Sequence, residues 1–139
     1  MASSPTNAGA VSELPGVHPS LRVRGLVILI VVLAEILIGN ELAVIGPPYP
    51  WSWIGIHIAV GLLLVAITGH AFGLSVRRTR KATAQVSSGV TFLSSLGAVA
   101  AGFVFLFGGQ SNGALYGMEG LGGLALLGGL LMIVFGSNR

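Results

Sequence analysis

Four apolar stretches, each containing about 20 residues, divide this chain and restrict what it can fold into. Each is long enough to cross ~30 Å of hydrocarbon as an α-helix, and none shows the strand alternation of a membrane barrel. The stretches cover residues 25–45, 53–76, 86–109 and 118–136. The first is too long for the apolar region of a secretory signal, so we expect it to remain as a span. We predict an all-α fold, an integral membrane four-helix bundle formed by residues 25–139, with a polar N-terminal tail at residues 1–24.

The residue inventory excludes most classes of soluble enzyme. Charged residues make up 8% of the chain, against roughly a quarter in ordinary soluble domains, and the mean hydropathy is +0.91. Cys and Asp are absent, which excludes disulfides, iron–sulfur clusters, thiolate metal sites and a Ser–His–Asp triad. The sequence contains neither a glycine-rich phosphate loop nor a His pair at i, i+4. We therefore expect no catalytic residues, no metal site and no enzymatic activity of the chain's own.

The basic residues are distributed in a way that predicts how the helices are oriented. Arg22, Arg24, the cluster at residues 77–81 and Arg139 all fall on one side of the membrane if there are four spans. Lys and Arg are retained on the cytoplasmic side, so we expect a multi-pass protein of the cytoplasmic membrane with both termini in the cytoplasm. The same distribution leaves no basic face, so nucleic acid is not an expected partner.

Glu35 lies near the middle of the first stretch and is a candidate proton or cation site. An ionised carboxylate at that depth costs about 3 kcal/mol on insertion scales, so the residue should be protonated, paired or facing a cavity. The alternative is a neutral acid hydrogen-bonded to a neighbouring helix. Asn40, Glu41 and Glu119 are expected near the outer surface, where water reaches them.

The second stretch carries His57 and His70, separated by thirteen residues, or ~20 Å of helix. An apolar helix with a His near each end and small residues beside it resembles the ligand helix of di-haem b-type membrane cytochromes. That resemblance implies haem b, with Met118 or Met132 as possible sixth ligands, because the only other histidine is His18 in the tail. Thirteen residues also turn a helix by about 220°, so the two rings should point to different faces. The alternative is an imidazole that hydrogen-bonds across the bundle.

From His57 onward the chain also resembles a group of small, uncharacterised four-span prokaryotic membrane proteins. The matching features are the His-x-x-x-Gly opening of the second span, a Gly- and Ala-rich third span, and the polar turn Gly-Gln-Ser-Asn-Gly at residues 109–113. The resemblance implies a prokaryotic membrane and no particular activity.

Small residues should control how the helices pack. Gly97 with Ala101, and Ala98 with Gly102, form small-xxx-small pairs, and the fourth stretch is rich in glycine. We expect them to pack within the bundle; the alternative is that the fourth helix docks onto a separate subunit. On function, we expect a small non-catalytic accessory subunit of a larger membrane complex, with a respiratory or otherwise redox-linked complex as the first expectation. Its expected partners are the lipid bilayer and other membrane subunits. The alternatives are a haem b electron carrier and a homo-oligomeric proton or cation transporter that uses Glu35.

Overall fold

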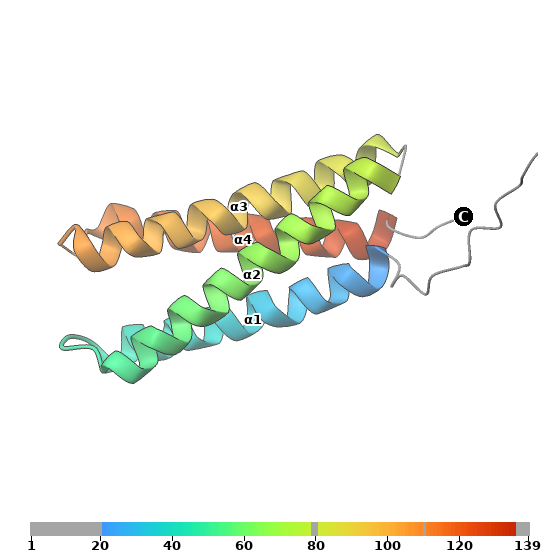
Figure 1. Ribbon diagram of the computed structural model, residues 1–139. Coiled ribbons are helices and arrows are strands. Elements are labelled where there is room, and N and C mark those ends of the chain that lie inside the picture. The colour runs from blue at the N-terminus through green and yellow to red at the C-terminus, as the bar shows by residue number, and fades with distance from the viewer. Residues whose placement is uncertain (1–20, 79–80, 110, 136–139) are drawn as a thin grey trace, which may run out of the picture.

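The computed structural model describes residues 21–78, 81–109 and 111–135, and these residues form four long helices (Figure 1). The helices are α1 (Leu21–Ile45), α2 (Trp51–Arg78), α3 (Ala82–Phe107) and α4 (Asn112–Phe135). All four are long and apolar enough to cross a membrane. The all-α, four-helix membrane fold predicted from the sequence is therefore confirmed. The tail at residues 1–20, which includes His18, and Arg80 and Arg139 lie outside the described residues.

The helices run up and down, and each packs against its neighbours in the chain. α2 packs against α1 and α3, α4 packs against α3 and α1, and the diagonal pairs of described helices make no backbone contact. The link at residues 46–50 and the described residues 108, 109 and 111 lie at one end of the bundle, which we call the loop end (Figure 1). The starts of α1 and α3 and the ends of α2 and α4 lie together at the other end.

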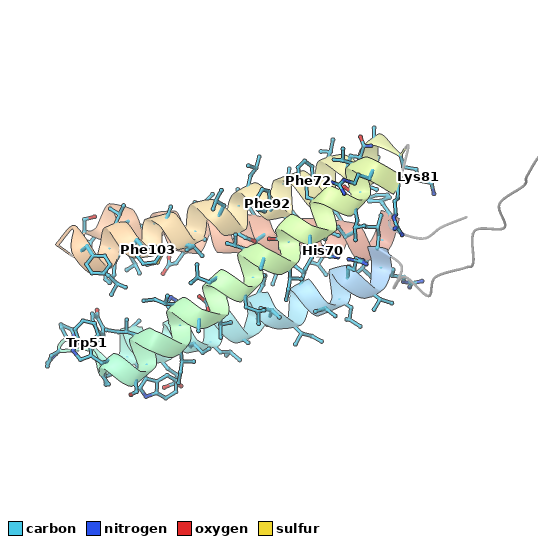
Figure 2. All side chains as sticks on the ribbon, viewed as in Figure 1. Trp51, His70, Phe72, Lys81, Phe92 and Phe103 are labelled. Atoms are coloured by element: carbon cyan, nitrogen blue, oxygen red, sulfur yellow. The ribbon has the colours of Figure 1, made fainter. Side chains whose placement is uncertain are left out.

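The described basic residues all lie at this second end, which we call the basic end. They come from the first turn of α1, the last turn of α2 and the residue that precedes α3: Arg22, Arg24, Arg77, Arg78 and Lys81. Figure 2 shows Lys81 at this end and Trp51 at the other. The described acids, Glu35, Glu41 and Glu119, all lie away from it. Charge is thus sharply separated along the bundle axis.

All four helices begin earlier than the apolar stretches predicted, because a helix can continue through the polar residues that flank its apolar part. The largest difference is in α4, which begins at Asn112, six residues before the predicted span. The side-chain oxygen of Ser111 accepts a hydrogen bond from the amide of Ala114 at 3.3 Å, and so caps this helix. α1 likewise begins at Leu21, so part of the predicted tail is helical. Gly46 and Gly109, with φ of 69° and 92°, adopt the left-handed conformation at the links, which favours glycine.

Short polar side chains, rather than large apolar ones, fill much of the bundle interior. The buried hydroxyl residues, on α2 and α3, are Thr68, Ser75, Ser87, Ser88, Thr91, Ser94 and Ser95. Ser75 and Ser88 join α2 to α3 through a hydrogen bond of 2.6 Å between their hydroxyls. The large apolar side chains mostly lie on the outer surface. This inside-out distribution suits a bundle surrounded by lipid, where close backbone approach replaces hydrophobic burial as the packing force.

The predicted small residues of α3 pack within the bundle. Gly97 faces the side chain of Leu121, and Gly102 faces the sulfur of Met118, both on α4. The glycines of α4 divide into two groups. Gly128 and Gly129 are buried against α3 and α1, whereas a side chain at Gly120, Gly122 or Gly123 would meet open space. The expectation of intramolecular packing is therefore confirmed for the first group only.

Candidate functional site

Glu35 on α1 and His57 on α2 face each other inside the bundle. The carboxylate Oε1 lies 3.2 Å from the imidazole Nδ1, and the Glu35 and His57 side chains are only 18% and 25% exposed. Glu35 is two residues from the midpoint of α1, which places its backbone ~3 Å from the middle of that helix. The chain therefore holds an acid and a base in contact between α1 and α2, with both side chains mostly buried.

Two glycines give this pair its space. A Cβ at Gly61, one turn after His57, would lie 3.0 Å from Glu35 Oε1 and 3.2 Å from Val99 of α3. A Cβ at Gly39, one turn after Glu35, would lie 3.4 Å from the His57 ring. The glycine of the His-x-x-x-Gly pattern thus makes room for a group on the neighbouring helix, because the absence of a side chain at Gly61 lets the Glu35 carboxylate approach α2.

The hydrogen bonding of the pair is incomplete. Glu35 Oε2 and His57 Nδ1 are buried and have no hydrogen-bond partner among the described residues, although the Oε1–Nδ1 distance is short enough for an ion pair. The two groups are therefore in contact without the alignment of a hydrogen bond. Buried polar atoms normally have partners, and each exception calls for an explanation such as a proton, a water molecule or a bound ion.

The pair can exist in two neutral forms that differ by the position of one proton. Either the carboxyl is protonated beside a neutral imidazole, or a carboxylate lies beside an imidazolium. Both forms avoid a net charge in a region where water is scarce, whereas removing or adding a proton leaves one. The arrangement can therefore hold one proton on either partner, and direct transfer between Oε1 and Nδ1 requires the two groups to rotate into hydrogen-bond alignment.

His70 does not join this site. It is an exposed residue on the outer surface of α2, thirteen residues and about 220° of helix rotation from the inward-facing His57 (Figure 2). Met118 packs at Gly102, and Met132, only 1% exposed, lies in the apolar core with Ile28 and Val32. The four residues that could ligate haem therefore have separate surroundings, and they do not fit a haem held within this bundle.

The remaining polar candidates are exposed. Asn40 and Glu41 lie on the surface of α1 near its loop end, as expected. Glu119 is also exposed, but α4 begins earlier than predicted, so Glu119 lies seven residues inside the helix, ~10 Å from its start. Within the described ranges, no three His, Cys, Asp or Glu side chains gather as a metal site.

Sequence reasoning identified Glu35 and His57 separately and did not predict that they meet. It also missed the buried hydroxyls of α3. A signal for the latter was present, because the residues Ser87, Ser88, Thr91, Ser94 and Ser95 recur at the three- and four-residue spacing of one helix face.

Comparisons with protein families, with characterised proteins and with solved structures found no match to this chain.

Proposed function

We propose that this protein binds and exchanges a proton inside the membrane at Glu35 and His57. The observation that carries the proposal is the 3.2 Å contact between the carboxylate of Glu35, near the middle of α1, and the imidazole of His57, in the second turn of α2, with one carboxylate oxygen left unpartnered. Ionisable residues within membrane spans are expensive and commonly mark ion or proton pathways. A protein with this site would couple proton movement to its own conformation or to that of a partner.

A proton suits the site better than a metal ion. One carboxylate and one imidazole supply too few ligands for a metal cage, and the described residues offer no third acid or imidazole beside them. A proton needs only one lone pair at a time, and His is the side chain whose ordinary pKa is nearest to neutrality.

The orientation that we propose for the bundle places the basic end in the cytoplasm. Five described basic residues support it, because Lys and Arg are retained on that side during insertion. Glu35 then lies in the middle of the membrane and His57 towards the outer side. The prokaryotic cytoplasmic membrane, suggested by the resemblance noted above, remains part of this proposal.

The outward surface of α4 supports a second proposal, an accessory role in a larger membrane complex. Glu119 points away from the bundle beside Tyr116 and Gly120, and Gly123 follows one turn later, all exposed. An acid that faces hydrocarbon costs about 3 kcal/mol, which a donor on a partner helix would offset. Glycines without neighbours would let that helix approach closely. In this second proposal the partner is a membrane complex, with a redox-linked complex as the first hypothesis. The alternative is a homo-oligomeric transporter that uses Glu35.

Infrared spectroscopy of the purified protein tests the proton site directly. Difference spectra between acidic and alkaline buffer should contain a band from a protonated carboxyl group that disappears in Glu35→Gln and shifts in His57→Gln. Glu41→Gln is the matched control, because Glu41 is exposed on the same helix, and it should leave that band in place. An unchanged band in Glu35→Gln would remove the proposal.

Reconstitution into vesicles tests the transport version. Proton uptake driven by a pH gradient, followed with an enclosed pH-sensitive dye, should be lost in Glu35→Gln and kept in Glu41→Gln. If the infrared band depends on Glu35 but wild-type vesicles show no uptake, proton binding is retained and transport by the isolated chain is excluded.

A further inference from the structure

A groove on the outer surface of the bundle lies between α3 and α4, on their basic-end halves. It encloses about 350 Å³ and its lining is almost entirely apolar. One wall comes from α3 and includes Ala82 and Val86, and the other comes from α4 and includes Leu124, Leu127, Gly128 and Phe135. Gly128 lies at the base of the groove against Ser87 and Thr91 of α3, where a Cβ would collide with that helix.

The length and position of the groove match one leaflet of a bilayer. Its α4 wall runs from Leu124 to Phe135, twelve residues that span ~16 Å of helix, from the middle of α4 to its end. Half of a ~30 Å hydrocarbon core is ~15 Å. The groove is therefore long enough for one acyl chain lying parallel to the helices.

Basic residues lie at the end of the bundle to which the groove extends. Lys81 is exposed and directly precedes Ala82, the first lining residue of α3, and Figure 2 shows it at the basic end. Arg77 and Arg78 end α2, which packs against α3. No acid lies at this end among the described residues. Basic positions at the ends of apolar grooves between membrane helices suit anionic lipid headgroups.

We infer that this groove binds an anionic phospholipid of the leaflet at the basic end, with one acyl chain between α3 and α4 and the phosphate at Lys81. The apolar walls select a hydrocarbon chain, and the charge at the mouth selects the headgroup. The inference is independent of the proton site, because it uses other residues and another face of the bundle.

Native mass spectrometry tests it with two probes that differ only in headgroup charge. The protein, purified in detergent, is titrated with phosphatidylglycerol and, separately, with phosphatidylcholine that carries the same acyl chains. Wild type should retain one phosphatidylglycerol in preference to phosphatidylcholine. Lys81→Gln should lower phosphatidylglycerol affinity about fivefold, the effect of one basic residue near an anionic lipid, and leave phosphatidylcholine nearly unchanged.

Filling the groove from either wall provides the complementary test. Val86→Trp on α3 and Leu127→Trp on α4 should each reduce retention of phosphatidylglycerol to the level of phosphatidylcholine. Leu37→Trp, on the exposed surface of α1 and outside the groove, is the control and should behave as wild type. Circular dichroism establishes that each variant keeps its helix content. Equal retention of both lipids by wild type, or unchanged preference in folded Val86→Trp and Leu127→Trp, overturns the inference.

Discussion

The hydroxyl of Thr91 occupies the position where a side chain at residue 128 would begin, so Gly128 sets how closely α3 and α4 can approach. A Cβ at Gly128 would collide with Thr91 Oγ1 and would lie 3.2 Å from the carbonyl oxygen of Ser87. Both neighbours belong to a buried part of α3 and cannot move aside without displacing that helix. This contact explains why residue 128, buried against α3, is a glycine.

Gly128→Ala should therefore destabilise the protein by about 1–3 kcal/mol, the usual cost of inserting a methyl group into a closely packed interior. Gly122→Ala is the matched control, because a side chain there meets open space. Alanine is the better helix former, so the control should be neutral or more stable by up to about 1 kcal/mol. Unfolding in mixed micelles, with helix content as the signal, measures both. Equal stability of the two variants would contradict the packing described.

Glu35 and His57 should be energetically coupled. In a double-mutant cycle with Glu35→Ala and His57→Ala, we expect an interaction of about 0.5–3 kcal/mol, because each single change leaves the other polar group in the interior without its neighbour. The same unfolding assay gives the four free energies. A cycle of Glu41→Ala with His57→Ala supplies the reference and should show additivity, since Glu41 is exposed and not paired with His57.

Ser75→Ala should weaken the contact between α2 and α3. The change removes the 2.6 Å hydroxyl pair with Ser88, and hydrogen bonds between membrane helices contribute about 0.6 kcal/mol on average. The loss should be small because Ser88 also donates to the carbonyl oxygen of Ala84 at 2.8 Å and so keeps a partner. Ser52→Ala, exposed in the first turn of α2, is the control. A loss above about 2 kcal/mol would show that Ser75 has a larger role.

Single cysteines can test the proposed orientation without background, because the chain contains no cysteine of its own. A cysteine at Ser52 or Asn112, both at the loop end, should react with an impermeant thiol reagent applied to intact cells. One at Thr79, in the basic link between the second and third spans, should react only after the membrane is permeabilised. Labelling in the reverse order would place the basic end outside.

The sequence predicted the fold well and the site only in part, for reasons that differ between residues. The four spans follow from apolar length, a local property that needs no knowledge of neighbours. The contact between Glu35 and His57 depends on how α1 and α2 are rotated and tilted against each other. The sequence of either helix alone does not determine that arrangement. Glu119 was expected at the helix start, because the Ser111 cap that begins α4 earlier was not recognised.

The hydroxyl-rich interior also explains why hydrophobic periodicity is a poor guide to which face of each helix points into the bundle. In a soluble bundle the most apolar face points inwards. Here Ser88, Thr91 and Ser95 are buried, whereas Leu93 and Leu96 on the same helix are exposed. Lipid accepts leucine as readily as a protein interior does, so the inward face is chosen by size and hydrogen bonding.

In the proton site proposed above, the position of Glu35 near the middle of α1 would make proton binding depend on the membrane potential. Its backbone lies ~3 Å from the middle of α1, so a proton that reaches the carboxylate from either side crosses about half of the transmembrane field. A full crossing corresponds to about 2.3 kcal/mol per 100 mV, so half a crossing corresponds to about 1.2 kcal/mol. Occupancy of the site should then change about sevenfold for each 100 mV, an energised membrane favouring protons that arrive from the positive side.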